Sequence, residues 1–167
     1  LDEEALRLLA GALGDLGRRD EAMREYEAIA ALKPGDLDAS LRLADLQKGL
    51  GRPRAAIGLY ETILEKNPAN LDALREAARL YDDMSMPLRA IFCWQRVLTV
   101  EASDLEAQSR LAAAYRQIGA EDAALGKFEA VGKAGDADAW LQVAALRLKR
   151  NERDRAGGAL REAIKLR

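Results

Sequence analysis

The stretch GALGDLGRRDEA, residues 11–22, is the first place where residue types and spacing suggest chemistry. Three glycines within seven residues, followed by two arginines, are typical of a loop whose backbone amides bind phosphate. A nucleotide-binding loop needs the spacing GxxxxGK[ST] or GxGxxG after a strand, and neither spacing occurs here. The preceding segment EEALRLLA has the periodicity of a helix. We therefore interpret the stretch as a bend between two helices instead of a phosphate site.

Side chains that commonly carry catalysis or hold metals are scarce. The chain has no histidine, which removes the commonest general base and the commonest metal ligand. Cys93 is the only cysteine, so we expect neither an internal disulfide nor a thiolate metal cluster. Carboxylates are abundant, but helix N-termini and exposed helix faces account for them. We expect no catalytic residue, no metal site and no cofactor, and we interpret the protein as a non-enzyme.

The overall charge and hydropathy exclude two further classes of target. The net charge is −2 and the pI is near 5.4, so there is no basic field to attract nucleic acid. No apolar run approaches the ~20 residues that span a bilayer, so we expect no membrane insertion. A cytoplasmic and a periplasmic location both remain open. Because the chain begins at Leu1 instead of Met, we expect it to be part of a longer protein.

A period of 34 residues organises the chain, and several independent columns of residues share it. One column suits a bend and consists of Gly17, Gly51, Ser85 and Gly119. A second column is always alanine and consists of Ala22, Ala56, Ala90 and Ala124. A third column is aromatic and consists of Tyr26, Tyr60, Trp94 and Phe128. The chain is therefore built from tandem copies of one structural unit.

Each unit contains two helical stretches. In the second unit, residues 37–50 have apolar residues at helical spacing, and Gly51 ends this helix. Residues 53–66 form a second amphipathic stretch, with Pro53 suited to its first turn. Pro68 forces the preceding residue out of the helical conformation and so ends it. The unit is a helix pair.

A helix pair repeating every 34 residues resembles the tetratricopeptide repeat (TPR), whose pattern is W-x2-L-G-x2-Y, then Ala, an aromatic residue and Pro. The second unit follows this pattern with Ser40, Leu43, Ala44, Gln47, Ala56, Tyr60, Ile63 and Pro68. The fifth unit begins two residues early and follows it with Trp140, Val143, Ala144, Arg147, Ala156, Leu160 and Ala163. The repeats are about 3–36, 37–70, 71–104, 105–136 and 137–167. The resemblance implies one all-α domain over residues 1–167, a right-handed α-solenoid of antiparallel helix pairs.

In this family the first helices line a concave groove, and a peptide, helix or domain of a partner lies there. From helical phase, we expect the partner-binding residues on this face to be Arg7, Arg42, Asp45, Arg75, Arg79, Arg110, Arg116 and Gln142. Two interpretations of these arginines remain open. They are either a solvated face with pairs within a helix, such as Arg42 with Asp45, or a groove for a partner with acidic segments.

Phe92 is a further candidate contact, on the outer side of the second helices. Its column otherwise contains glycine, at Gly58, Gly126 and Gly158. A glycine in the middle of a helix costs about 1 kcal/mol relative to alanine, so the column needs a reason. Two interpretations remain open, namely drift in an exposed column and a smooth strip where Phe92 meets a partner or a second copy.

The resemblance points to a non-catalytic scaffold for protein–protein interaction. The lysines and asparagines with which one subclass grips a C-terminal carboxylate are absent from the corresponding positions. Two narrower alternatives are the periplasmic scaffold of a bacterial exopolysaccharide export system and the substrate-recruiting region of a larger enzyme such as a glycosyltransferase. The uncapped ends of such a solenoid also offer edges for self-association.

Overall fold

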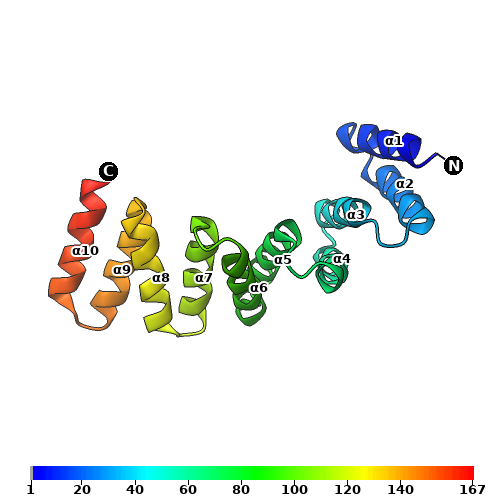
Figure 1. The fold of residues 1–167 in the computed structure, drawn as a ribbon. Coiled ribbons are helices and arrows are strands. Elements are labelled where there is room, and N and C mark those ends of the chain that lie inside the picture. Colours follow the sequence, from blue (N-terminus) through cyan, green and yellow to red (C-terminus); the bar gives the residue numbers. More distant parts are fainter. Residues whose placement is uncertain (1) are drawn as a thin grey trace. The chain divides into compact units, whose positions relative to one another are not determined.

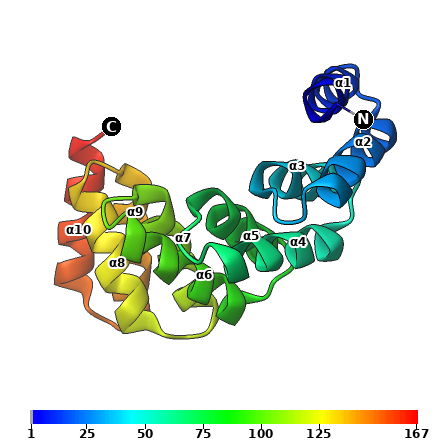
Figure 2. The same ribbon diagram turned by 45° about the vertical axis from the view of Figure 1, so that its right-hand side comes forward.

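The structure, a computed structural model, describes residues 2–167 and consists of ten α-helices without a strand in that range. Within each of the two units, neighbouring helices pack on each other, α1 with α2, α2 with α3 and α3 with α4 in the first unit, and α6 through α10 in sequence in the second. Figures 1 and 2 show α7 to α10 running antiparallel to one another. The helices are α1 (Glu3–Asp15), α2 (Arg19–Leu32), α3 (Leu37–Gly49), α4 (Pro53–Lys66), α5 (Leu71–Asp83), α6 (Pro87–Val100), α7 (Leu105–Gln117), α8 (Glu121–Lys133), α9 (Ala137–Lys149) and α10 (Arg153–Lys165). This confirms the predicted all-α fold of helix pairs.

The first helix of every pair begins at an Asp or Asn side chain that accepts a hydrogen bond from a backbone amide of the first turn. These capping residues are Asp2, Asp36, Asn70, Asp104 and Asp136. Asp36 Oδ1, for example, lies 2.9 Å from the Ala39 amide nitrogen. A cap of this kind is worth about 1 kcal/mol because it satisfies an otherwise unpaired N–H. The second helices α4 and α6 begin at Pro53 and Pro87 instead.

Within each helix pair, the bend requires one residue in the left-handed region. Gly17, Gly51 and Gly119 take φ angles of 71° to 76°, as the bend column predicted. Ser85 takes the same region at φ 54°, although a side chain makes that conformation unfavourable. Asn151, at φ 62°, is the fifth member of the column. The two-residue shortening before the fifth repeat displaces Asn151 from the 34-residue interval.

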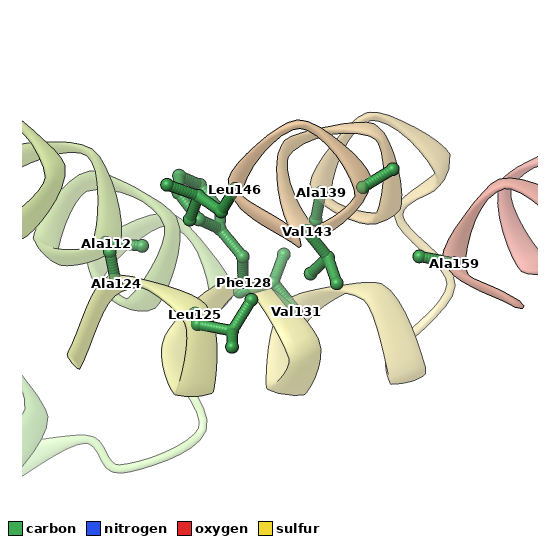
Figure 3. Close-up of a cluster of buried hydrophobic side chains, with 10 residues drawn as sticks. Ala112, Ala124, Leu125, Phe128, Val131, Ala139, Val143, Leu146 and Ala159 are labelled. Atoms are coloured by element: carbon green, nitrogen blue, oxygen red, sulfur yellow. The ribbon is translucent and has the colours of Figure 1, made fainter. Parts of the chain in front are cut away.

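The chain divides into two compact units, one up to Leu80 and one from Tyr81 onward. In the first unit, one layer of the core joins α1, α2 and α3 and contains Leu6, Ala10, Tyr26, Ile29, Ala39 and Leu43. In the second unit, a corresponding layer gathers side chains from α7, α8, α9 and α10, centred on Phe128, Val131 and Val143 (Figure 3). Each layer lies between neighbouring helices, as expected for stacked repeats. That residues 1–167 form one domain stays a prediction.

Candidate functional site

A groove runs between the first helices α3 and α5 of the first unit. Its volume is about 400 Å³, and it is lined by Asp38, Leu41, Arg42, Asp45, Lys48, Asp72, Arg75, Glu76 and Arg79. Four of the predicted site residues therefore lie together in it, namely Arg42, Asp45, Arg75 and Arg79.

A second hollow, of about 410 Å³, continues this groove between α1 and α3. The two hollows share Asp38, Arg42 and Asp45 on α3, and the second one also includes Arg7. We call the two together the α1–α3–α5 groove.

Two of the five α1 residues that line this groove, Gly11 and Gly14, have no side chain. A Cβ built at either glycine would meet no atom within 4 Å, so close helix packing does not explain them. The corresponding positions on α3 are Asp45 and Lys48, whose side chains fill the groove there. The two glycines weaken α1 by about 1 kcal/mol each and leave space beside α3.

The charges that line the deeper part of the groove balance. The cations are Arg42, Lys48, Arg75 and Arg79, and the anions are Asp38, Asp45, Asp72 and Glu76. These eight side chains therefore sum to no net charge.

Glu76 joins two of these cations. Its carboxylate oxygens lie 2.5 Å from Lys48 Nζ on α3 and 2.7 Å from Arg79 Nη1 on its own helix. Burial acts to raise the pKa of Glu76, but the two cations outweigh burial and hold this pKa below its usual value. The carboxylate therefore stays ionised and fixes both cations at the side of the groove.

Asp45 is held by a different partner from the one expected. The hydroxyl of buried Tyr60 donates to Asp45 Oδ1 at 2.7 Å, and Lys48 Nζ lies 3.7 Å from the same oxygen. Burial, followed by this hydrogen bond, raises the pKa of Tyr60. The expected pair of Arg42 with Asp45 is wrong, because Arg42 instead contacts Asp38 at 3.8 Å. The Arg42 side chain remains 59% exposed at the junction of the two hollows.

Arg7 lies at the rim and is already engaged by three carboxylates. Its guanidinium contacts Glu3, Asp36 and Asp38, and so connects α1 to the start of α3. The Ala39 amide and then Arg7 lower the pKa of Asp36 against the opposing effect of burial. The contacts of Arg7 hold α1 against the start of α3, and they also fix its guanidinium at the rim of the groove.

The remaining predicted residues on first helices lie in the second unit. Arg116 Nη1 donates to Gln142 Oε1 at 2.6 Å and so connects α7 to α9. Arg110 lies 3.9 Å from Glu106 and lines a hollow of about 250 Å³ with Ser109 and Asp136. This second set does not belong to the α1–α3–α5 groove.

Phe92 is 59% exposed on α6, and the Arg96 guanidinium lies 5.4 Å from the centre of its ring. Leu88, one turn earlier, is 70% exposed. These two side chains make α6 apolar at positions where α8 has Asp122 and Gly126.

Sequence reasoning missed Lys48, which lines the groove and holds Glu76. The only signal in the sequence was its position one turn after Asp45 on the same helix. Among residues 2–167 no group of three or more His, Cys, Asp or Glu is placed to hold a metal ion. Within the same range, no helix combines the length and hydropathy needed to cross a bilayer.

Neither models of protein families nor curated protein sequences match this chain. Solved structures do match it. A crystal structure of MamA has a TM-score of 0.86 at 19% identity, and the match covers 98% of this chain and 91% of MamA. MamA from Desulfovibrio magneticus RS-1, residues 41 to the end, gives 0.82 at 13% identity over 98% and 94%. YrrB, a TPR protein with an unusual peptide-binding site, gives 0.82 at 21% identity over 99% and 87%. Similarities at this level of identity show the fold, and the fold is that of the tetratricopeptide repeat.

Proposed function

Because the chain has the tetratricopeptide-repeat fold, we propose that it is a non-catalytic scaffold that binds a segment of a partner protein in the α1–α3–α5 groove. The observation that carries this proposal is the pair of glycines on the α1 side of the groove. Gly11 and Gly14 weaken the helix and relieve no clash, yet they leave open a hollow continuous with the charged groove on α3 and α5.

The arrangement of charges supports a partner segment that carries both signs. Arg42, at the junction of the hollows, is placed to bind a carboxylate of the partner. Asp72, in the same lining, offers an acceptor for a cation of the partner. Leu41 adds apolar surface to the same lining. A purely acidic segment, the narrower form of this proposal, would use the arginines but leave the anions unmatched.

The experiment is selection of displayed random peptides on the wild-type chain, followed by measurement of their affinity for variants. We expect Arg42→Glu combined with Arg75→Glu to weaken the selected peptides at least tenfold. The matched control is Arg54→Glu, an exposed position at the start of α4 outside the groove, which should leave affinity unchanged. Equal affinity for the groove variant and the control would show that the groove is not the binding site.

Neither narrower alternative is favoured by an observation in residues 2–167. What would distinguish an exopolysaccharide scaffold or the recruiting region of a glycosyltransferase from a general scaffold is the sequence around the repeats. We therefore propose partner binding alone.

A further inference from the structure

Two large apolar side chains of α6, Leu88 and Phe92, are exposed at positions where the other second helices have none. The residues that correspond to Leu88 are all charged, namely Asp20, Arg54, Asp122 and Asp154. The residues that correspond to Phe92 are Arg24, Gly58, Gly126 and Gly158. Because the other helix pairs fold without an apolar side chain at either position, helix packing does not account for Leu88 and Phe92.

These two side chains form one apolar strip in the middle of the chain. They lie one helical turn apart, so they are neighbours on the helix surface, with Leu88 70% exposed and Phe92 59% exposed. The Arg96 guanidinium lies over the Phe92 ring, 5.4 Å from its centre. The strip therefore offers a partner an apolar surface with a cation held beside it.

The charge of α6 has a single sign. Residues Pro87–Val100 contain two arginines, Arg89 and Arg96, and no carboxylate. By helical phase, both arginines fall on the same side of the apolar strip. Each is held by an aromatic ring, since the Arg89 guanidinium lies 5.6 Å from the centre of the Tyr81 ring. A guanidinium has five N–H donors, so it can keep this ring contact and bind a carboxylate as well.

We propose that the strip of Leu88 and Phe92, with Arg89 and Arg96 beside it, binds an acidic amphipathic helix of another protein. Apolar residues of that helix cover the strip, and its carboxylates meet the two guanidinium groups. This site shares no side chain with the α1–α3–α5 groove and so goes beyond the binding proposed there.

The charge of α6 favours this occupant over two others. Pairing of α6 with α6 of a second copy would bring arginines against arginines, which is unfavourable. An anionic lipid surface attracts clusters of about four to eight basic residues, whereas α6 has only Arg89 and Arg96. An acidic helix matches both the apolar strip and the sign of the charge.

The test is selection of displayed random peptides on the wild-type chain, after removal of the peptides that also bind Phe92→Glu. The enriched peptides should carry Asp or Glu beside two apolar residues spaced three or four positions apart. Leu88→Glu should weaken them about tenfold, as expected for a central apolar contact. Arg96→Gln should weaken them about threefold, as expected for an exposed ion pair.

Two controls separate this site from the rest of the surface. Leu8→Glu changes an equally exposed leucine, at 71%, on α1 and should leave the affinity unchanged. The groove variant, Arg42→Glu combined with Arg75→Glu, should also bind these peptides like the wild type. Loss of binding in the groove variant, with Leu88→Glu unaffected, would assign the peptides to the groove and overturn the α6 site. Circular dichroism of each variant verifies that the fold is intact.

Four further outcomes would overturn the proposal. Selection that enriches no peptide, or enriches peptides without carboxylates, would show that α6 does not bind an acidic helix. Sedimentation of the wild-type chain tests for a second copy, and binding to vesicles of phosphatidylserine and phosphatidylcholine tests for a lipid surface. A dimer that Phe92→Glu abolishes would make a second copy the occupant, and vesicle binding that Phe92→Glu abolishes would make it a membrane.

Discussion

The indole ring of Trp140 on α9 lies directly against Gly132 on α8. A Cβ built at Gly132 would stand 2.8 Å from Cδ2 of the ring and 2.9 Å from Cε2. Gly126, on the same helix, has no atom within 4 Å of the corresponding position. One helix therefore contains a glycine that packing requires and a glycine that packing does not require.

Gly132→Ala should lower the free energy of unfolding by about 1–3 kcal/mol, because the added methyl group must displace a rigid, partly buried ring. Gly126→Ala should instead raise it by about 0.5–1 kcal/mol through helix propensity. Urea denaturation followed by circular dichroism measures both. If both variants were stabilised alike, the close approach of Trp140 to Gly132 would be wrong.

Ser85→Gly should stabilise the chain by about 1 kcal/mol, because Ser85 holds a φ of 54° that glycine adopts without strain. The reciprocal substitution Gly51→Ser places a side chain at φ 71° and should destabilise by a similar amount. Thermal denaturation of the two variants gives the comparison. A loss of stability in Ser85→Gly would mean that the serine side chain contributes more than the strain costs.

The bend column shows how far the sequence predicts this fold. Residue types at a regular interval identify the helix pairs and the bends, because local conformation decides both. Asn151 was missed because the interval shortens before it. The contact of Lys48 with Glu76 was missed because the two residues are 28 positions apart on different helices. Whether their side chains meet depends on how one repeat stacks on the next. The predicted pair of Arg42 with Asp45 was wrong for the same reason, because the hydroxyl of buried Tyr60, on another helix, donates to Asp45.

Glu76→Gln should lower stability at neutral pH by about 0.2–1 kcal/mol, the range for partly exposed ion pairs. The folded-state pKa of Glu76 lies below its ordinary value of 4.5, so its stabilisation is present above pH 4.5 and is lost as the pH falls through the folded-state pKa. The difference between variant and wild type should therefore shrink in acid. Denaturant titrations across this pH range test it, and a difference independent of pH would contradict the role of the charge.

Asp82→Asn should raise stability at neutral pH, whereas Glu76→Gln should lower it. Burial raises the pKa of Asp82 above its ordinary 3.8, although the Trp94 indole N–H donates to its carboxylate at 3.0 Å. The folded chain therefore favours the protonated form, a stabilisation present below pH 3.8 and lost as the pH rises through the raised pKa. An amide oxygen still accepts from Trp94, so the variant should be more stable than the wild type at neutral pH.

The gain from Asp82→Asn should disappear in acid, where Asp82 is protonated. The control is Asp154→Asn, which makes the same change of charge at an exposed position in the first turn of α10, where a carboxylate favours the helix, so this variant should not be stabilised at neutral pH. Equal responses of the two variants at neutral pH would mean that burial of Asp82 is not the cause.

The central claim is that partner segments bind in the α1–α3–α5 groove, and the glycine amides report on it directly. Nitrogen-15 spectra of the chain should be recorded during titration with a peptide selected on it. The account predicts that the amide resonances of Gly11 and Gly14 shift, while those of Gly126 and Gly158, on the second helices outside the groove, stay in place. Shifts at Gly126 and Gly158 with Gly11 and Gly14 unchanged would contradict it.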